Sequence, residues 1–179
     1  MNRDRWLSTV KNVLGNVNIA VEIGVWNADY SVKICNSLSP KQFYGIDPYV
    51  QYDNAPNVNA YETAAKLEET YLKAAAKLPP HGKIIRDFSV NAAELFEDES
   101  IDFVYIDGDH NYEAVTADIK AWYPKIKSGG IISGHDYIEK NAKRNIVFGV
   151  IPAVTEFSKE YNKNISLTSE AYATWWTIK

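Results

Sequence analysis

Short runs of apolar residues alternate with helix-like segments along most of this chain. The hydrophobicity of these runs is continuous, as in Phe103–Ile106, and does not alternate regularly with polar residues. Continuous hydrophobicity is typical of strands buried on both faces, and strands separated by helices form a parallel sheet with helices on either side. We therefore predict an α/β fold with five parallel strands: Ile19–Gly24, Gln42–Asp47, Lys83–Asp87, Ile101–Asp107 and Gly130–Gly134.

The segments between these runs have the residue pattern of helices. Tyr61–Leu78 is rich in Ala, Lys, Glu and Leu and is followed by two prolines, which end helices. Further helices are predicted at Ser31–Leu38 and Pro152–Tyr161, and the amphipathic start of the chain predicts another. One more helix follows the fourth strand and places four apolar residues on one face: Val115, Ile119, Trp122 and Ile126.

The last part of the chain departs from this order. Two runs rich in β-forming residues, Ile165–Thr168 and Ala173–Ile178, are joined by a short loop without a helix. Such strands must be antiparallel to each other, because a parallel pair needs a long crossover connection. We therefore expect a Rossmann-like, doubly wound α/β fold whose mostly parallel, seven-stranded sheet ends in an antiparallel C-terminal edge element.

Length and charge argue against several classes of protein. With 179 residues, of which 46% are hydrophobic, the chain can bury a core as one domain over residues 1–179. A net charge of −4 and the lack of a Lys/Arg block argue against nucleic-acid and membrane partners. The single Cys35 can form no intramolecular disulfide, and the N-terminus lacks the apolar core of a signal peptide. We therefore predict a cytoplasmic protein.

Polar residues and glycines gather where the predicted strands end. In an open α/β sheet, ligands bind in the crevice beyond the carboxyl ends of the strands. The residues at these ends include Glu22, Gly24, Asp47, Asp87, Phe88, Ser89, Asp107, His110, His135 and Asp136. All five parallel strands therefore contribute to one candidate site.

The residues at the ends of the first two predicted strands suit a nucleoside-binding site. Gly24 allows a ligand to approach the backbone closely, just before a helix N-terminus near Ser31 whose free N–H groups can hold a carboxylate. Asp47 lies where an acid accepts hydrogen bonds from ribose hydroxyls in nucleoside-binding folds. Each feature alone is also typical of a plain turn. The chain lacks a G-x-G-x-x-G turn, which argues against a nicotinamide-dependent oxidoreductase.

The last two strand ends combine carboxylates with imidazoles. Asp107, Asp109 and His110 follow one predicted strand, and His135 with Asp136 follow the next. Mixed oxygen and nitrogen ligands suit Mg²⁺, Mn²⁺ or a related divalent cation. Asp-Gly-Asp is also a common turn, and a lone histidine more often makes an ordinary hydrogen bond. Two of the three histidines nevertheless belong to this cluster, so it is a candidate metal site.

The order of these motifs resembles a class I S-adenosylmethionine-dependent methyltransferase. The most specific parts are Tyr-Ile-Asp-Gly-Asp-His-x-Tyr-Glu at 105–113 and Gly-Gly-Ile-Ile-x-Gly-His-Asp-Tyr at 129–137. The resemblance spans about residues 18–178. The group that it resembles most contains small methyltransferases related to catechol and macrocin-type (sugar) O-methyltransferases.

The resemblance implies a role for each strand end. It implies cofactor contacts at six positions: Glu22, Gly24 and Ser31 for the methionine end, Asp47 for the ribose, and Phe88 with Ser89 for the adenine. It implies a metal bound by Asp107, His135 and Asp136, with His110 as general base. Two positions depart from the family's pattern: Ala28 replaces a second glycine, and His135 replaces a carboxylate, which lowers the charge of the metal site.

We therefore predict an S-adenosylmethionine-dependent O-methyltransferase that acts on a small hydroxylated acceptor such as a sugar or glycoside. A divalent metal, Mg²⁺ or Mn²⁺, held partly by Asp107, would position the acceptor hydroxyl, and His110 would take its proton. The sequence is compatible with a homo-oligomer. The alternatives are a catalytically silent nucleoside-binding or assembly module, a nicotinamide-dependent oxidoreductase and a metal-assisted hydrolase. The titratable cluster argues against the first.

A basic loop lies close to the predicted metal site. The segment Tyr137–Phe148 carries Lys140, Lys143 and Arg144. Such a cluster suits a phosphate or carboxylate on the acceptor, although most basic loops are only solvated surface.

Overall fold

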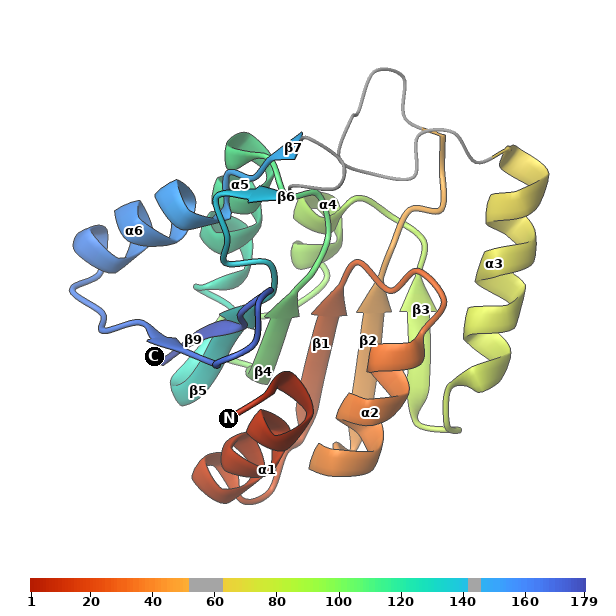
Figure 1. The fold of residues 1–179 in the computed structure, drawn as a ribbon. Helices are drawn as coiled ribbons and strands as arrows, with labels where there is room; N and C mark the ends of the chain where they lie inside the picture. The colour runs from red at the N-terminus through yellow and green to blue at the C-terminus, as the bar shows by residue number, and fades with distance from the viewer. Residues whose placement is uncertain (52–62, 142–145) are drawn as a thin grey trace.

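The computed structural model describes residues 1–51, 63–141 and 146–179, in which a seven-stranded sheet carries helices on both faces (Figure 1). The strand order is β3-β2-β1-β4-β5-β9-β8. The strands are β1 (Ile19–Ile23), β2 (Gln42–Ile46), β3 (Gly82–Ile85), β4 (Ile101–Ile106), β5 (Ile126–Gly134), β8 (Ser166–Leu167) and β9 (Trp175–Ile178). Strands β1 to β5 are parallel, and β9 is antiparallel to β5 and β8. The predicted fold class is confirmed.

Helices cover both faces because the central strands carry apolar side chains on both sides. The helices in the described ranges are α1 (Arg3–Leu14), α2 (Asp29–Leu38), α3 (Ala64–Lys77), α4 (Ser89–Ala93), α5 (Tyr112–Trp122) and α6 (Val150–Glu160). Phe103 of β4 belongs to a core with residues of α1 and α2. The next residue, Val104, belongs to a separate core with residues of α5 and α6. Within the described ranges, no helix combines the length and apolar composition needed to cross a membrane.

The prediction that Ile126 lies on a helix is wrong. Helix α5 ends at Trp122, and Ile126 begins β5 with a fully buried side chain. Pro124 explains the difference, because it has no backbone N–H to continue the helical hydrogen bonds and its ring clashes with the preceding turn of a helix. Ile126 is therefore apolar because it belongs to the sheet, and β5 begins earlier than the predicted Gly130.

Some short elements were not predicted. Helix α4 has only 5 residues and follows the turn after β3. Strands β6 (Lys140–Asn141) and β7 (Ile146–Val147) pair antiparallel within the segment predicted as a polar loop. Elements this short contain too few residues to produce a periodic pattern. Lys143, Arg144 and the predicted helix start at Tyr61 lie outside the described residues.

The sheet order places a topological switch point between β1 and β4. Strand β1 pairs with β2 on one side and with β4 on the other, so the connections from their carboxyl ends diverge. Gly24 follows β1 with a φ of +85°, and a Cβ here would lie 2.1 Å from the backbone carbonyl oxygen of Asp107. Only glycine lets the ends of β1 and β4 approach this closely.

Candidate active site

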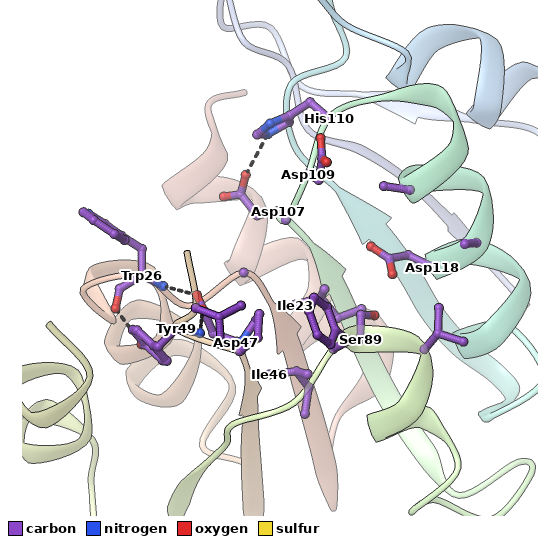
Figure 2. A pocket seen from close by; sticks show the side chains of 18 of the residues that line it. Ile23, Trp26, Ile46, Asp47, Tyr49, Ser89, Asp107, Asp109, His110 and Asp118 are labelled. Atoms are coloured by element: carbon purple, nitrogen blue, oxygen red, sulfur yellow. Dashed lines mark hydrogen bonds and ion pairs between the residues drawn. The ribbon is translucent and has the colours of Figure 1, made fainter. Parts of the chain in front are cut away.

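A cavity of about 410 Å³ opens at the carboxyl ends of the parallel strands (Figure 2). Residues that follow β1, β2 and β4 line it together with residues of α4 and α5. The lining combines apolar and carboxylate groups, among them Gly24, Asp47, Phe88, Ser89, Asp107, His110 and Asp118. The volume falls in the range of pockets that bind small molecules and cofactors.

Backbone amides hold the Asp47 carboxylate in this cavity. Its Oδ2 accepts a hydrogen bond from the Trp26 amide at 2.9 Å, and its Oδ1 accepts one from the Tyr49 amide at 3.0 Å (Figure 2). Tyr49 also donates its hydroxyl to the Trp26 carbonyl oxygen at 2.6 Å. Burial raises the pKa of Asp47, whereas the amide hydrogen bonds favour its charged form. Since each carboxylate oxygen has two acceptor sites, Asp47 can also accept hydrogen bonds from a ligand.

The loop between β1 and α2 contains three residues with left-handed backbone: Gly24, Trp26 and Ala28, with φ of +85°, +49° and +61°. Such angles are uncommon for residues other than glycine. Ala28 stands where the family resemblance implies a glycine, and its φ accounts for that preference. Ala28 is also fully buried in a core cluster with Leu67 of α3, so packing offsets the backbone strain.

Glu22 and Ser31 form a buried pair beside the cavity. Glu22 is only 1% exposed, and the Ser31 hydroxyl donates a hydrogen bond to its carboxyl group. Burial raises the pKa of Glu22 to about 8, and the hydrogen bond from Ser31 acts in the opposite direction. Within the described ranges, neither residue is part of the cavity lining. Their contact with a cofactor stays a prediction.

Phe88 and Ser89 lie between β3 and the body of α4, and both line the cavity. The indole Nε1–H of Trp122 donates to Ser89 Oγ at 2.8 Å. This bond fixes the start of α4 against α5. Phe88 is 49% exposed, and an aromatic ring beside a cavity can stack on a nucleobase.

Three side chains form a cluster of potential metal ligands. One ligand atom from each lies within 4.8 Å of the other two, and the residues are Asp107, His110 and Asp136. His110 Nε2 lies 2.7 Å from Asp136 Oδ2 and 3.7 Å from Asp107 Oδ1, and its ring stacks on Phe148. Burial lowers the pKa of His110, but its interactions with the two carboxylates outweigh burial and raise the pKa to about 9. Although burial opposes it, hydrogen bonds from His110 and His135 hold the pKa of Asp136 well below its usual range.

His135 lies next to these three residues. Its Nδ1 is 3.3 Å from Asp136 Oδ1 and 3.6 Å from Asp107 Oδ1. The resemblance implied a metal bound by Asp107, His135 and Asp136, whereas the ligand atoms that come together among the described residues include His110 in place of His135. The set of Asp107, His110 and Asp136 could hold a divalent cation, because two carboxylates and an imidazole are ligands that such ions accept.

The chain matches a family model described as "Methyltransferase domain" over residues 21–137. This interval runs from β1 to the residues after β5 and contains every strand end that contributes to the cavity. The chain belongs to this methyltransferase family.

Solved structures that resemble the methyltransferase are described with different activities. A Staphylococcus aureus protein assigned as a caffeoyl-CoA O-methyltransferase has a TM-score of 0.69 and 14% identity, covering 100% of this chain and 84% of that chain. CalS11, a TDP-rhamnose 3′-O-methyltransferase of calicheamicin biosynthesis, has a TM-score of 0.61 and 14% identity, with coverages of 98% and 77%. A spermidine synthase from Thermotoga maritima has a TM-score of 0.61 and 17% identity, with coverages of 98% and 58%. At these identities the likeness shows the fold.

A curated relative of the methyltransferase is the uncharacterized protein y4gI of Sinorhizobium fredii. The two sequences are 33% identical over 54 residues. The match covers 30% of this chain and 6% of that protein, so the chain spans a small part of this relative's length.

Arg3 of α1 is a site residue that the sequence patterns did not reveal. Its Nη2 lies 2.8 Å from Asp107 Oδ2, and its guanidinium carbon lies 3.6 Å from the centroid of the Tyr30 ring. Arg3 and Asp107 are 104 residues apart in the sequence. Because Arg3 belongs to a segment that reads as an ordinary amphipathic helix, no local signal marks it.

Asp118 of α5 is a second residue that the sequence analysis missed. It is 6% exposed and lines the cavity. A signal for it was present, because Asp118 follows Val115 by three positions and precedes Trp122 by four. This spacing places a carboxylate on the otherwise apolar face of the helix.

Proposed function

We propose that the methyltransferase transfers a methyl group to a hydroxyl oxygen of a small acceptor, such as a sugar or glycoside, with the help of a divalent cation. One observation carries this proposal. A single cavity is lined both by Asp47, a carboxylate suited to ribose hydroxyls, and by Asp107 and His110 of the carboxylate–imidazole cluster (Figure 2). The TDP-rhamnose 3′-O-methyltransferase among the structural neighbours supports a hydroxylated acceptor.

We infer an orientation for S-adenosylmethionine from the residues at the strand ends. Asp47 would accept hydrogen bonds from the ribose hydroxyls, and Phe88 with Ser89 would border the adenine. Gly24 follows β1 and lines the cavity, and it would lie beside the methionine end. The buried pair of Glu22 and Ser31 would support that end from beside the cavity.

Asp107 and Asp136 would hold the cation, with His135 as the nitrogen ligand. When bound, a divalent cation polarises the acceptor hydroxyl and lowers its pKa. This assignment leaves His110 as the general base, since its Nε2 lies beside both carboxylates. Arg3 contributes a permanent positive charge at Oδ2 of Asp107, whereas His110 lies nearer to Oδ1.

Methyl transfer then requires alignment and the removal of one proton. Against the lowering effect of burial, Asp107 and Asp136 raise the pKa of His110 to about 9, and a cation that offset their charge would leave the imidazole neutral. The acceptor hydroxyl would then give its proton to Nε2 of His110 while its oxygen forms a bond to the methyl carbon. The bond between that carbon and the sulfonium sulfur breaks, and the electron pair stays on sulfur. The products are S-adenosylhomocysteine and a methyl ether. Because oxygen, carbon and sulfur must be in line, much of the rate acceleration comes from positioning.

Ligand binding to the whole protein tests the cofactor. S-adenosylmethionine and S-adenosylhomocysteine should raise the unfolding temperature, and NAD should not, because a ligand that binds only the native state stabilises it. Asp47→Ala should weaken S-adenosylhomocysteine binding by about tenfold or more in calorimetry, since it removes paired hydrogen bonds. The exposed Glu97→Ala serves as control and should bind as the wild type does. Unchanged affinity in Asp47→Ala would exclude the ribose role.

Activity assays test the cation and the base. Methyl transfer to hydroxylated acceptors should rise when Mg²⁺ or Mn²⁺ is added, and Asp136→Ala should lose this stimulation. Full activity in the presence of a chelator would contradict the role of the cation. His110→Ala should lower turnover more than cofactor affinity, because the base acts on the acceptor.

The length, charge and composition of the chain support further proposals about its domain organisation, location and partners. We infer one methyltransferase domain over residues 1–179 and a cytoplasmic location. We also infer small-molecule partners, with no nucleic acid or membrane partner, and self-association is compatible with the sequence.

A further inference from the structure

Asp118 is a buried carboxylate that the proposed chemistry does not use. It belongs to α5, is 6% exposed and lines the cavity. Figure 2 shows its carboxyl group pointing away from α5, toward the space between Ser89 and Asp109. Burying a carboxylate is costly unless it gains hydrogen-bond partners. Its place in the lining therefore points to a partner inside the cavity.

The protein itself supplies a hydrogen bond to Asp118 from one direction. Because the Trp122 indole N–H donates to Ser89 Oγ at 2.8 Å, the Ser89 hydroxyl proton remains available for the Asp118 carboxyl. Burial raises the pKa of Asp118 to about 7, and the hydrogen bond from Ser89 opposes that effect. A carboxylate has about four acceptor sites, so Asp118 can accept a further hydrogen bond from a ligand.

Small residues keep the Asp118 carboxyl accessible from the cavity. A Cβ at Gly108 would lie 3.9 Å from Asp118 Oδ2 and 3.5 Å from Ile23 Cγ2, which are ordinary contact distances, so Gly108 lies directly beside the carboxyl. Gly108, Ala114 and Ala117 all belong to the lining. Together they leave room for a flat ring beside α5.

We propose that Asp118 accepts a hydrogen bond from the exocyclic amino group of adenine and determines the base specificity of the cofactor site. The inference rests on the proposed function, in which Asp47 binds the ribose and Ser89 borders the adenine. An amino group is a hydrogen-bond donor, whereas hypoxanthine has a keto oxygen at the same ring position. A carboxylate attracts the first group and repels the second.

Asp87, the other carboxylate near the start of α4, has a different role. Its Oδ1 accepts hydrogen bonds from the Phe88 amide at 2.7 Å and from Asn91 Nδ2 at 3.1 Å. Within the described ranges, Asp87 is not part of the cavity lining. Asp118 is therefore better placed to contact a base inside the cavity.

Calorimetry with two ligands tests this role. S-adenosylhomocysteine carries the amino group of adenine, and S-inosylhomocysteine carries the keto oxygen of hypoxanthine at the same ring position. The affinities of both are measured near pH 8.5. This pH is about one unit or more above the pKa of Asp118, so the carboxyl is mostly ionised. The wild-type protein should prefer S-adenosylhomocysteine by about tenfold or more. Asp118→Asn should reduce the preference by about tenfold, because an amide can donate to the keto oxygen. The control Glu113→Gln makes the same acid-to-amide change at an exposed position of α5 and should keep the wild-type preference.

The outcomes separate this role from the proposed function. Equal binding of the two compounds by the wild-type protein would overturn the inference without any variant, and so would an unchanged preference in Asp118→Asn. If Asp118→Asn does not fold, Asp118→Ser provides the same comparison with a smaller side chain. A wild-type protein that bound neither compound would refute the proposed cofactor itself, whereas binding of both with equal affinity would reject only the role of Asp118.

Discussion

At the scale of single residues, the site consists of carboxyl groups in unequal surroundings. Glu22 is buried against one hydroxyl, and burial raises its pKa to about 8. Asp136 lies between two imidazoles, which hold its pKa well below the usual range. Asp47 is bound by two amides. Acids of the same chemical type therefore differ in charge at one pH, which allows separate roles within one cavity.

Glu22→Gln should change how stability depends on pH. In the unfolded chain Glu22 loses its proton near its ordinary pKa of 4.5, whereas in the folded protein it keeps the proton up to about pH 8. Between these values the folded state binds the extra proton, so this contribution to stability is complete below pH 4.5 and is lost as pH rises toward 8. Relative to Glu22→Gln, the wild type should lose at most about 1.4 kcal/mol per pH unit over this window.

Urea unfolding at several pH values measures this difference. The exposed Glu97→Gln is the matched control and should follow the wild-type curve. Parallel curves for the wild type and Glu22→Gln between pH 5 and 8 would show that Glu22 ionises at its ordinary pKa in the folded protein.

At the scale of elements, helix α1 completes the active site from outside the family-matched interval. Asn2 caps its N-terminus by accepting a hydrogen bond from the Arg5 amide at 3.0 Å. Trp6 packs its ring 5.8 Å from that of Phe103, which fixes the helix on the sheet. Because Arg3 lies in the first turn, this packing carries its guanidinium to Asp107.

Removing the Arg3 charge should strengthen cation binding. Arg3 and a divalent cation would compete for Asp107, so Arg3→Gln should bind Mn²⁺ more tightly, on the order of tenfold. Arg5→Gln, an exposed position of the same helix, should bind Mn²⁺ as the wild type does. Calorimetric titration measures both affinities. Weaker Mn²⁺ binding in Arg3→Gln would show that Arg3 supports the cation site and does not compete with it.

At the scale of the whole molecule, the sheet creates the site by bringing the ends of β1 and β4 together. The closest approach is at Gly24, where even one methyl group would overlap the Asp107 carbonyl. In Figure 1 the arrows of β1, β2, β3 and β4 point toward the same edge. The cavity therefore depends on a backbone contact between segments far apart in the sequence.

Gly24→Ala should destabilise the protein and weaken cofactor binding. Gly129→Ala is the matched control, because Gly129 has a similar φ of +81° but nothing within 4 Å of the added Cβ. The control should cost about 1 kcal/mol, from backbone strain alone. Gly24→Ala should cost about 2 kcal/mol more, because the strand ends must separate. Urea unfolding compares the two, and equal losses would show that the close approach is unimportant for stability.

The sequence by itself determined the strands, the helices and the edge of the sheet at which polar residues gather. These are local patterns: a buried parallel strand is a continuous apolar run, and a helix repeats its apolar face every three or four residues. The pattern was misleading at Ile126, where a sheet residue continued the helical spacing after Pro124. It also contained the signal for Asp118, a carboxylate at an apolar helical position.

Only the tertiary structure decided how these parts meet. It brought Arg3 to Asp107 across 104 residues, and it placed His110, in addition to His135, beside the two carboxylates. It also placed Asp118 in the cavity lining, next to Gly108. Such contacts depend on how helices pack on the sheet and on distances of a few ångströms, and neither leaves a periodic trace in the amino-acid sequence.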